Sequence, residues 1–322
     1  MEVGAVITCC KRGTAVGLSW VILLWVIAAS CSDGLADSSG RAASKVCEQP
    51  TAVAILSDDL AEASGISRDP RRDDVFWLHN DSGNEALLYA VDTAGRTLGS
   101  VPVVAASAED LEDVSLSECD GAWCLYLADI GDNMAVRQDL YIHRLPLPDI
   151  PAAGSESTRG APVSPLDTYW IRYPEGPRDA EALVVDAARD ELLIVTKGRQ
   201  DIVELYAADL TDLAALDGPY LMTRIGRLAV PIGEGSQQLI TAADLSPDGS
   251  RLAVRSYASL YLFEWRGSAA FDTLAAPESA SLVAAFEPQG EGLTFTSDGR
   301  TLYLASEGRD RRPPQLSRMT CP

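Results

Sequence analysis

Acidic and hydroxyl side chains recur at one position of a repeated segment, and together they could bind a metal ion. The segment occurs five times, each time as a short apolar stretch, a turn and a second apolar stretch. The residues that begin the first apolar stretch of the successive copies are Ser64, Glu112, Glu181, Ala243 and Glu291. Carboxylate and hydroxyl oxygens are hard ligands that suit Ca²⁺. The pattern therefore predicts a Ca²⁺ on a common axis, with backbone carbonyls or water completing its coordination where Ala243 offers no oxygen.

A structural role is the alternative for these carboxylates. They could cap backbone amides at the start of the strands, with water filling the channel between them. Like charges that are packed together are costly unless a cation, a proton or hydrogen bonds compensate. Because three glutamates share one position of the repeat, we favour the metal site.

A second set of polar residues follows the second apolar stretch of the copies. In an antiparallel pair the second strand ends beside the start of the first, so these residues would surround the proposed ion. The set comprises His79, Asp81, Asp129, Asp132, Asn133, Lys197, Arg255, Tyr257 and Glu307. A phosphate ester or a sugar acid as substrate would need such cations to hold its anionic group and a carboxylate to activate water. Alternatively, these charges neutralise one another around the rim of a protein that binds a ligand without catalysis.

The repeated segment also predicts the strands that position these residues. Each copy reads as two antiparallel strands, and Asp-Gly dipeptides that favour hairpin turns lie between them at 120–121, 248–249 and 298–299. Third strands are expected at 87–91, 140–145, 203–207 and 260–265, and outer strands at 97–104, 168–173, 221–230 and 281–286. Four-stranded units of this kind are the blades of a β-propeller. We expect an all-β, five-bladed propeller. A six-bladed ring is the alternative, because the long intervals around the third copy could hide extra strands.

The two ends of the repeat region are expected to pair with each other. The fifth copy lacks an outer strand, which residues 52–56 could supply. Cys47 and Cys321 flank these terminal strands, and a disulfide between them would hold the ring closed. Cys119 and Cys124 flank a hairpin turn and could form a second disulfide. Free thiols in a reducing compartment are the alternative.

The first residues have the layout of an export signal. Lys11 and Arg12 precede an apolar run over 16–29 that is too short for a comfortable membrane span. The small residues before Cys31 resemble a bacterial lipoprotein processing site, which implies cleavage before Cys31 and lipid on its thiol. We therefore expect a signal peptide over 1–30, a flexible tether over 31–48 and the propeller over 49–322, anchored by lipid in a bacterial cell envelope. Cleavage without lipidation, which gives a secreted protein, is the alternative.

The charge of the chain limits its partners. The formal net charge is −21, so nucleic acid and anionic lipid surfaces are not expected to bind. Contact with a membrane is expected only through the lipid anchor. We expect a monomer that binds a small molecule or a protein at the face carrying the polar rim.

The motifs resemble those of known propeller families. The starts of the first strands, Ser64-Gly65-Ile66, Glu112-Asp113-Val114, Glu181-Ala182-Leu183 and Glu291-Gly292-Leu293, are similar to those of calcium-activated nucleotidases, the soluble apyrases. The resemblance implies five blades and one Ca²⁺ in the central channel, bound by serine and glutamate from successive blades; Ala243 departs from it. It also implies Asp81 as general base, with Lys197 and Arg255 holding the anionic group. The chain further resembles uncharacterised bacterial lipoprotein propellers and, more loosely, gluconolactonase-like and phytase-like propellers.

These observations predict an exported, lipid-anchored propeller with an axial Ca²⁺ that acts as a module for binding a ligand or partner. A calcium-dependent hydrolase of phosphate esters or lactones is the alternative.

Overall fold

The computed structural model of the protein describes residues 47–104, 108–150, 158–200, 202–230, 236–271, 274–282 and 287–322. The expected signal peptide, the lipidation of Cys31 and most of the tether lie outside these residues, as do positions 283–286 of one expected outer strand. Among the described residues, no helix is both long and apolar enough to cross a membrane.

The strands form five sheets, as the five-bladed prediction requires. Blade one contains β2 (Ala63–Arg68), β3 (Val75–Asn80), β4 (Leu87–Asp92) and β5 (Thr97–Pro102). Blade two contains β6 (Leu111–Cys119), β7 (Ala122–Asp129), β8 (Leu140–Pro146) and β9 (Asp167–Arg172). Blade three contains β10 (Ala180–Asp186), β11 (Glu191–Thr196), β12 (Val203–Asp209) and β14 (Thr223–Leu228). Blade four contains β15 (Ile240–Leu245), β16 (Arg251–Ser256), β17 (Ser259–Glu264) and β19 (Ser279–Leu282). Blade five contains β20 (Gln289–Phe295), β21 (Thr301–Glu307), β22 (Gln315–Thr320) and β1 (Thr51–Ile55).

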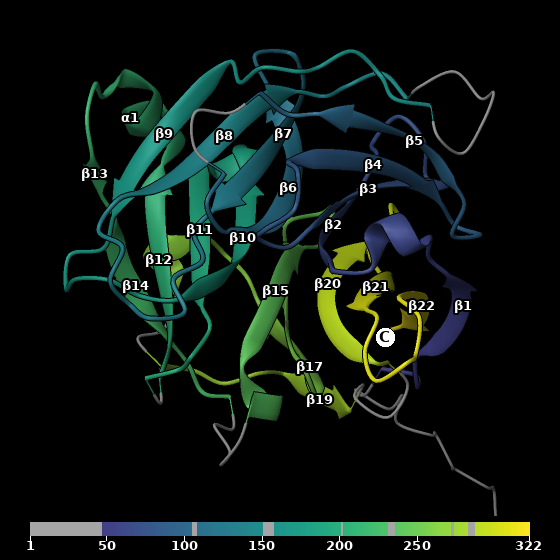
Figure 1. Ribbon diagram of the computed structural model, residues 1–322. Coiled ribbons are helices and arrows are strands. Elements are labelled where there is room, and N and C mark those ends of the chain that lie inside the picture. Colours follow the sequence, from purple (N-terminus) through teal and green to yellow (C-terminus); the bar gives the residue numbers. More distant parts are fainter. Residues whose placement is uncertain are drawn as a thin grey trace, which may run out of the picture. The chain divides into compact units, whose positions relative to one another are not determined.

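The innermost strand of each blade contacts the innermost strands of both neighbouring blades, so the ring is closed. Figure 1 shows β2, β6, β10, β15 and β20 around a common centre. The first strand of each sequence repeat is therefore the channel-lining strand, as predicted. The fold thus brings to one axis residues that are far apart in the sequence.

The chain ends close the ring inside blade five. Strand β1 pairs with β22 antiparallel, and Figure 1 shows purple β1 beside yellow β22. A disulfide joins Cys47, which precedes β1, to Cys321, which follows β22. The second predicted disulfide, Cys119–Cys124, spans the turn between β6 and β7. Both cysteine pairings and the closure by the terminal strand are confirmed.

The long intervals around the third copy hold straps between blades rather than a sixth blade. Strand β13 (Tyr220–Leu221) follows helix α1 (Leu210–Ala215) and pairs parallel with β9 of blade two. After the fourth copy, strand β18 (Leu274–Ala275) pairs in the same way with β14 of blade three. Parallel bridges also join Arg159 to Ser100 of β5 and Val163 to Val103, which lies just after β5. Each strap covers an outer strand edge that would otherwise be free to pair with another chain.

The hydrophobic core consists of one cluster between each pair of neighbouring blades. Strand β11 illustrates why the middle strands are continuously apolar. Its Leu192 and Ile194 pack towards blade two, whereas Leu193 and Val195 pack towards blade four. Because side chains alternate between the two faces of a strand and both faces are buried, every position must be apolar. Short 3-10 helices, η1 (Asp58–Leu60), η2 (Ala187–Arg189), η3 (Ser236–Gln238) and η4 (Ser268–Ala270), lie in the connections.

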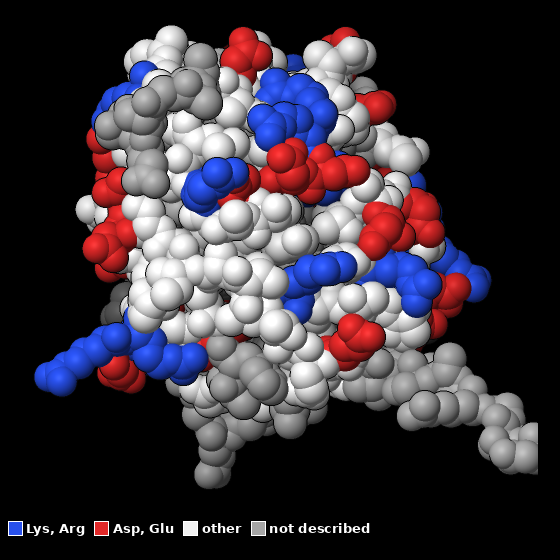
Figure 2. Space-filling view, turned by 90° about the vertical axis from the view of Figure 1, so that its right-hand side faces the viewer, with Lys and Arg blue, Asp and Glu red and all other residues white. Residues whose placement is uncertain are grey.

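The charged side chains of the surface are mixed in sign on the face that Figure 2 shows. Acidic and basic residues lie next to one another there, and apolar or neutral residues separate the groups. This part of the surface therefore has no extended field of one sign that would attract an oppositely charged polymer.

Candidate functional site

All five innermost strands carry a β-bulge at the same place, close to their start. The pairing with the second strand shifts register between Ala63 and Ile66, Leu111 and Asp113, Ala180 and Ala182, Ile240 and Ala242, and Gly290 and Leu293. A bulge bends the strand and redirects the side chain of the extra residue. The polar bulge residues are Ser64, Glu112, Glu181, Thr241 and Glu291. One hydroxyl or carboxylate from every blade is thus placed at the same level of the channel, which we call the channel mouth.

Blade four contributes Thr241 rather than the expected Ala243. Ala243 lies two positions further along β15 and pairs regularly with Val254. Thr241 also makes the contact that is typical of the position. Its Oγ1 donates to the carbonyl oxygen of Glu291 at 2.9 Å, as the Oγ of Ser64 donates to the carbonyl oxygen of Glu112 at 2.7 Å. The placement of Ala243 in the ring is therefore corrected to Thr241, because the bulge residue of blade four lies two positions before the residue that the sequence suggested.

The three glutamates of the mouth are buried and interact with one another. Their exposed fractions are 4% for Glu112, 3% for Glu181 and 5% for Glu291. Burial raises the pKa of Glu112 and of Glu291 well above the ordinary value, and the charge of Glu181 adds to both effects. Burial also raises the pKa of Glu181 to about 7, and a hydrogen bond links its carboxyl group to that of Glu112. These carboxyl groups therefore retain protons, or require a cation, near neutral pH.

Lys197 places one positive charge among these acids. It lies at the end of the second strand of blade three, is buried, and forms an ion pair with Glu181. Burial lowers the pKa of Lys197, but Glu181, Tyr257 and Glu112 outweigh that effect and raise the pKa overall. Three ionised glutamates and one ammonium would leave a net charge of −2 at the mouth, which a divalent cation would balance.

Asp81 and Asp110 extend the acidic group towards the solvent. One carboxylate oxygen each of Asp81, Asp110 and Glu112 lie within 4.8 Å of one another. Burial raises the pKa of Asp110, and the neighbouring Asp81 contributes to the rise. Asp81 was expected at the rim, whereas Asp110 was not. The sequence feature that could have identified Asp110 is its position two residues before the bulge. Residues that precede the bulge lie beside the end of the second strand and therefore at the rim.

In blade five, Gln289 links Glu291 to a further acid, Glu307. Its Nε2 donates to Glu291 Oε1 and to Glu307 Oε2, each at 2.7 Å. Burial raises the pKa of Glu307 to about 7, and Asp81 is the next contributor. Tyr257 is half-buried nearby, and burial together with Glu291 raises its pKa. Glu307 and Tyr257 therefore lie at the mouth as predicted, while Gln289 was not anticipated.

Arg255 does not lie at the mouth. It is fully buried between blades four and five, where its Nη2 donates to Glu287 Oε2 at 2.6 Å and its Nη1 to the carbonyl oxygen of Gly292 at 2.9 Å. It pairs with Ala242, beyond the bulge, so its side chain points to the neighbouring blade rather than to the channel. The expected role of Arg255 in holding an anion is corrected to a structural ion pair.

The remaining predicted rim residues support the loops around the mouth. Asp129 is buried and accepts from the backbone N–H groups of Glu109 and Asp110 and from Arg137. Asp132 accepts from the backbone N–H of Val136 and of Arg137, and Asn133 accepts from Arg199. His79 is buried with its Nδ1 2.8 Å from the carbonyl oxygen of Asn80, and burial lowers its pKa. Of this group, Asp129 shapes the site most directly, because it fixes the segment that carries Asp110.

Comparisons with known proteins add little to this picture. No family model matches the chain, and no curated protein matches it. Among solved structures, the chain is similar to one from the crystal structure of a nidogen/laminin complex, with 11% identity and a TM-score of 0.41 over 76% of this chain and 73% of that chain. A likeness at this level carries no argument, so the propeller assignment rests on the strand pairing described above.

Proposed function

We propose that this protein is a calcium-binding propeller whose channel mouth binds a ligand. The observation that carries the proposal is the set of five equivalent bulge residues, Ser64, Glu112, Glu181, Thr241 and Glu291. Each offers an oxygen, and oxygen is the donor that Ca²⁺ selects. When bound, the ion would supply positive charge that stabilises the ionised glutamates and attracts an electron-rich group of a ligand.

The charge of the mouth supports a divalent ion rather than a monovalent one. Lys197 already neutralises Glu181, so Glu112 and Glu291 remain to be balanced. Asp81 and Asp110 lie further out and offer additional oxygens beside Glu112. The ion would therefore bind with release of the protons that burial holds on these carboxyl groups.

A role in binding is favoured over hydrolysis because both cations that were expected to hold an anion already form ion pairs with glutamates. Arg255 is paired with Glu287 and Lys197 with Glu181. One observation favours the second candidate, a calcium-dependent hydrolase of phosphate esters or lactones. The carboxylate of Asp81 is half-exposed and lies beside Glu112, where a base could take a proton from water near the ion.

Calcium binding is tested by calorimetry and thermal unfolding of the protein after treatment with EDTA. We expect Ca²⁺ to raise the melting temperature, because it binds the folded state only. Glu291→Gln is expected to weaken Ca²⁺ binding at least about tenfold, which corresponds to roughly 1.4 kcal/mol. Glu278→Gln, which changes an exposed glutamate of blade four, is the matched control and should bind as the wild type does. A melting temperature that does not respond to Ca²⁺ would refute the proposal.

Hydrolysis is tested separately with nucleoside diphosphates, phytate and lactones, with Ca²⁺ and with EDTA. If the second candidate is right, the wild type turns over one of these substrates only with Ca²⁺, and Asp81→Asn loses the activity while it still binds the ion. No turnover of any of them by the wild type would remove this candidate and leave the binding role.

We also propose that the protein is exported, anchored by lipid on Cys31 and monomeric. The two disulfides support export, because such bonds form in oxidising compartments. Mass spectrometry of the N-terminal peptide would reveal a diacylated or triacylated Cys31, whereas an unmodified peptide would indicate secretion. Sedimentation in a non-ionic detergent would give the mass of one chain.

A further inference from the structure

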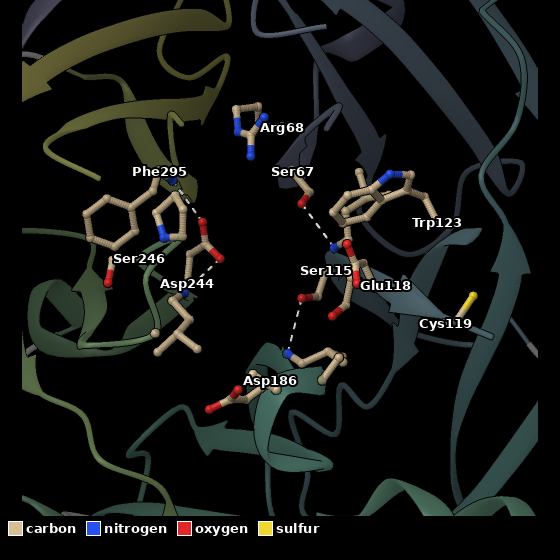
Figure 3. A pocket seen from close by; sticks show the side chains of 18 of the residues that line it. Ser67, Arg68, Ser115, Glu118, Cys119, Trp123, Asp186, Asp244, Ser246 and Phe295 are labelled. Atoms are coloured by element: carbon tan, nitrogen blue, oxygen red, sulfur yellow. Dashed lines mark hydrogen bonds between the residues drawn. The ribbon is translucent and has the colours of Figure 1, made fainter. Parts of the chain in front are cut away.

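The channel has a second polar region at the end opposite the mouth. There the turns between the first and second strands of blades two, three and four surround a cavity of about 750 Å³. This volume lies within the range of roughly 300–1,000 Å³ that is typical of small-molecule sites. Figure 3 shows Arg68, Ser67 and Ser115, Asp186 and Asp244 around an open centre. The cavity lies outside the set of residues that we propose to bind Ca²⁺.

One wall of the cavity presents hydroxyl groups that can donate hydrogen bonds. Ser67 Oγ accepts the backbone N–H of Leu116 at 3.2 Å, and Ser115 Oγ accepts the backbone N–H of Val185 at 3.2 Å. Neither hydroxyl donates to another residue of the described chain, so its hydrogen is available to a ligand. Both side chains are buried and belong to the channel-lining strands, so the inter-blade hydrogen bonds hold them in position.

The opposite wall presents carboxylates that accept hydrogen bonds. Asp244 faces Ser67 and Ser115 across the cavity in Figure 3. Its oxygens are fixed by the backbone N–H groups of Leu245 and Phe295, each at 2.8 Å. Asp186 is also buried, and its Oδ2 accepts from Arg189 and from Trp265. The Oδ2 atom of each aspartate already accepts two hydrogen bonds, since Thr294 Oγ1 also donates to Asp244 Oδ2. The Oδ1 atoms of Asp186 and Asp244 keep the capacity to accept from a ligand.

The charges around the cavity argue against an anionic ligand. The cavity is lined by two cations, Arg68 and Arg189, and by more carboxylates than these can neutralise, namely those of Glu118, Asp120, Asp186, Asp244 and Asp248. An anion would therefore meet excess negative charge. A neutral ligand with several hydroxyl groups would not, and each of its hydroxyls could accept from serine and donate to aspartate.

The wall also contains an aromatic surface. Trp123, at the start of β7, is half-buried and lines the cavity beside Glu118. A flat indole face beside hydrogen-bonding groups suits a ring that is apolar on its faces and hydroxylated at its edges. We propose that this cavity binds a neutral carbohydrate, with Trp123 against the sugar ring and the serine and aspartate side chains on its hydroxyl groups. This inference goes beyond the proposed function and does not depend on it.

The test is a titration of the full-length chain with glucose, galactose, N-acetylglucosamine, and disaccharides and trisaccharides built from these three sugars, followed by saturation-transfer NMR and calorimetry. The chain is kept in a detergent without a sugar headgroup, so that the detergent does not compete. Binding is expected with at least one of these sugars, both with Ca²⁺ and with EDTA. Spermidine and glucuronic acid serve as a cationic and an anionic probe. If none of the neutral sugars binds, the proposal is overturned, whether or not spermidine or glucuronic acid binds.

Matched variants locate the binding. Trp123→Ala is expected to weaken the sugar about tenfold, and Ser115→Ala by a smaller factor. Trp170→Ala is the control, because Trp170 is also half-buried but lies on the outer strand β9 with its Nε1 on Asp139. The melting temperature of each variant verifies folding, and Trp123→Phe, which keeps an aromatic face, should retain most of the affinity if Trp123→Ala proves unstable. A folded Trp123→Phe and a folded Trp170→Ala should therefore both bind the sugar about as the wild type does. A folded Trp123→Ala that binds as the wild type does would overturn the proposal.

Discussion

The mouth and the opposite cavity are built from the same innermost strands. They differ in the charge of their side chains and in the regularity of the strand pairing. At the mouth, the bulges place buried glutamates against one another, and Lys197 compensates only one of them. At the cavity, where the pairing is regular, short side chains such as Ser115 bond to the backbone of the next blade. The comparison shows how one strand serves two purposes. A bulge concentrates charge at its start, and regular pairing beyond the bulge leaves an open, hydroxylated wall.

The largest expected difference concerns the ion pairs of the two regions. Lys197→Met leaves Glu181 buried without its partner, so we expect a loss of roughly 3–5 kcal/mol in the free energy of unfolding. Arg68→Met at the cavity removes a pair with the exposed Asp73, for which a loss of at most about 1 kcal/mol is expected. Urea unfolding in EDTA measures both. The double variant Lys197→Met, Glu181→Gln should recover most of the loss, and equal effects of the two single variants would contradict the comparison.

The second prediction concerns pH and Ca²⁺ at the mouth. The pKa of Glu181 and of Glu307 is raised to about 7 from an ordinary value of 4.5, so the folded state binds more protons than the unfolded state between these pH values. The stability of the calcium-free protein must therefore fall as pH rises through this window. We expect the melting temperature in EDTA to drop by several degrees from pH 5 to pH 8, and less with Ca²⁺. A rise over the same range would show that the acids are ionised without an ion.

The third prediction sharpens the assignment of blade four. Thr241→Val removes the hydroxyl that reaches Glu291, and we expect Ca²⁺ affinity to fall about fivefold, or roughly 1 kcal/mol. Ala243→Ser adds a hydroxyl at the position that the sequence phase suggested, and the affinity should not change. Calorimetry of both variants decides the point. A larger change in Ca²⁺ affinity for Ala243→Ser than for Thr241→Val would mean that position 243, and not Thr241, lies beside the ion.

The smallest expected effect is the loss of stability when a serine of either region is replaced by alanine. Ser64→Ala breaks a buried hydrogen bond to the carbonyl oxygen of Glu112, so we expect a loss of about 1 kcal/mol in stability. Ser117→Ala at the cavity should change stability by less than about 0.5 kcal/mol, because no described residue bonds to the Ser117 side chain. Thermal unfolding distinguishes the two. A larger loss for Ser117→Ala would mean that the cavity hydroxyls are structural.

The fold was predictable because its signals are local and repeated. Short apolar stretches indicate strands and Asp-Gly dipeptides indicate hairpin turns, and their repetition along the chain indicates a ring of blades. The cysteines near the two ends of the repeat region indicate how the ring is closed. The mouth was predictable where a glutamate begins a strand. Ala243 was expected in place of Thr241 because no glutamate marks the start of the first strand in the fourth copy. Arg255 was expected at the rim because the sequence does not show that it pairs with Ala242, beyond the bulge. Asp110 precedes β6 and Gln289 is the first residue of β20, and no periodic pattern marks either position. The cavity was not anticipated, because its walls combine small polar residues from different blades that share no motif.

The central claim, that the five bulge residues surround one Ca²⁺, is tested most directly by anomalous diffraction from crystals of the calcium-loaded protein. The account predicts one anomalous peak on the channel axis, within coordination distance of Glu112, Glu181 and Glu291. If the crystals are saturated with Ca²⁺ and no peak lies there, so that Lys197 is the only cation among the three glutamates, the account is contradicted.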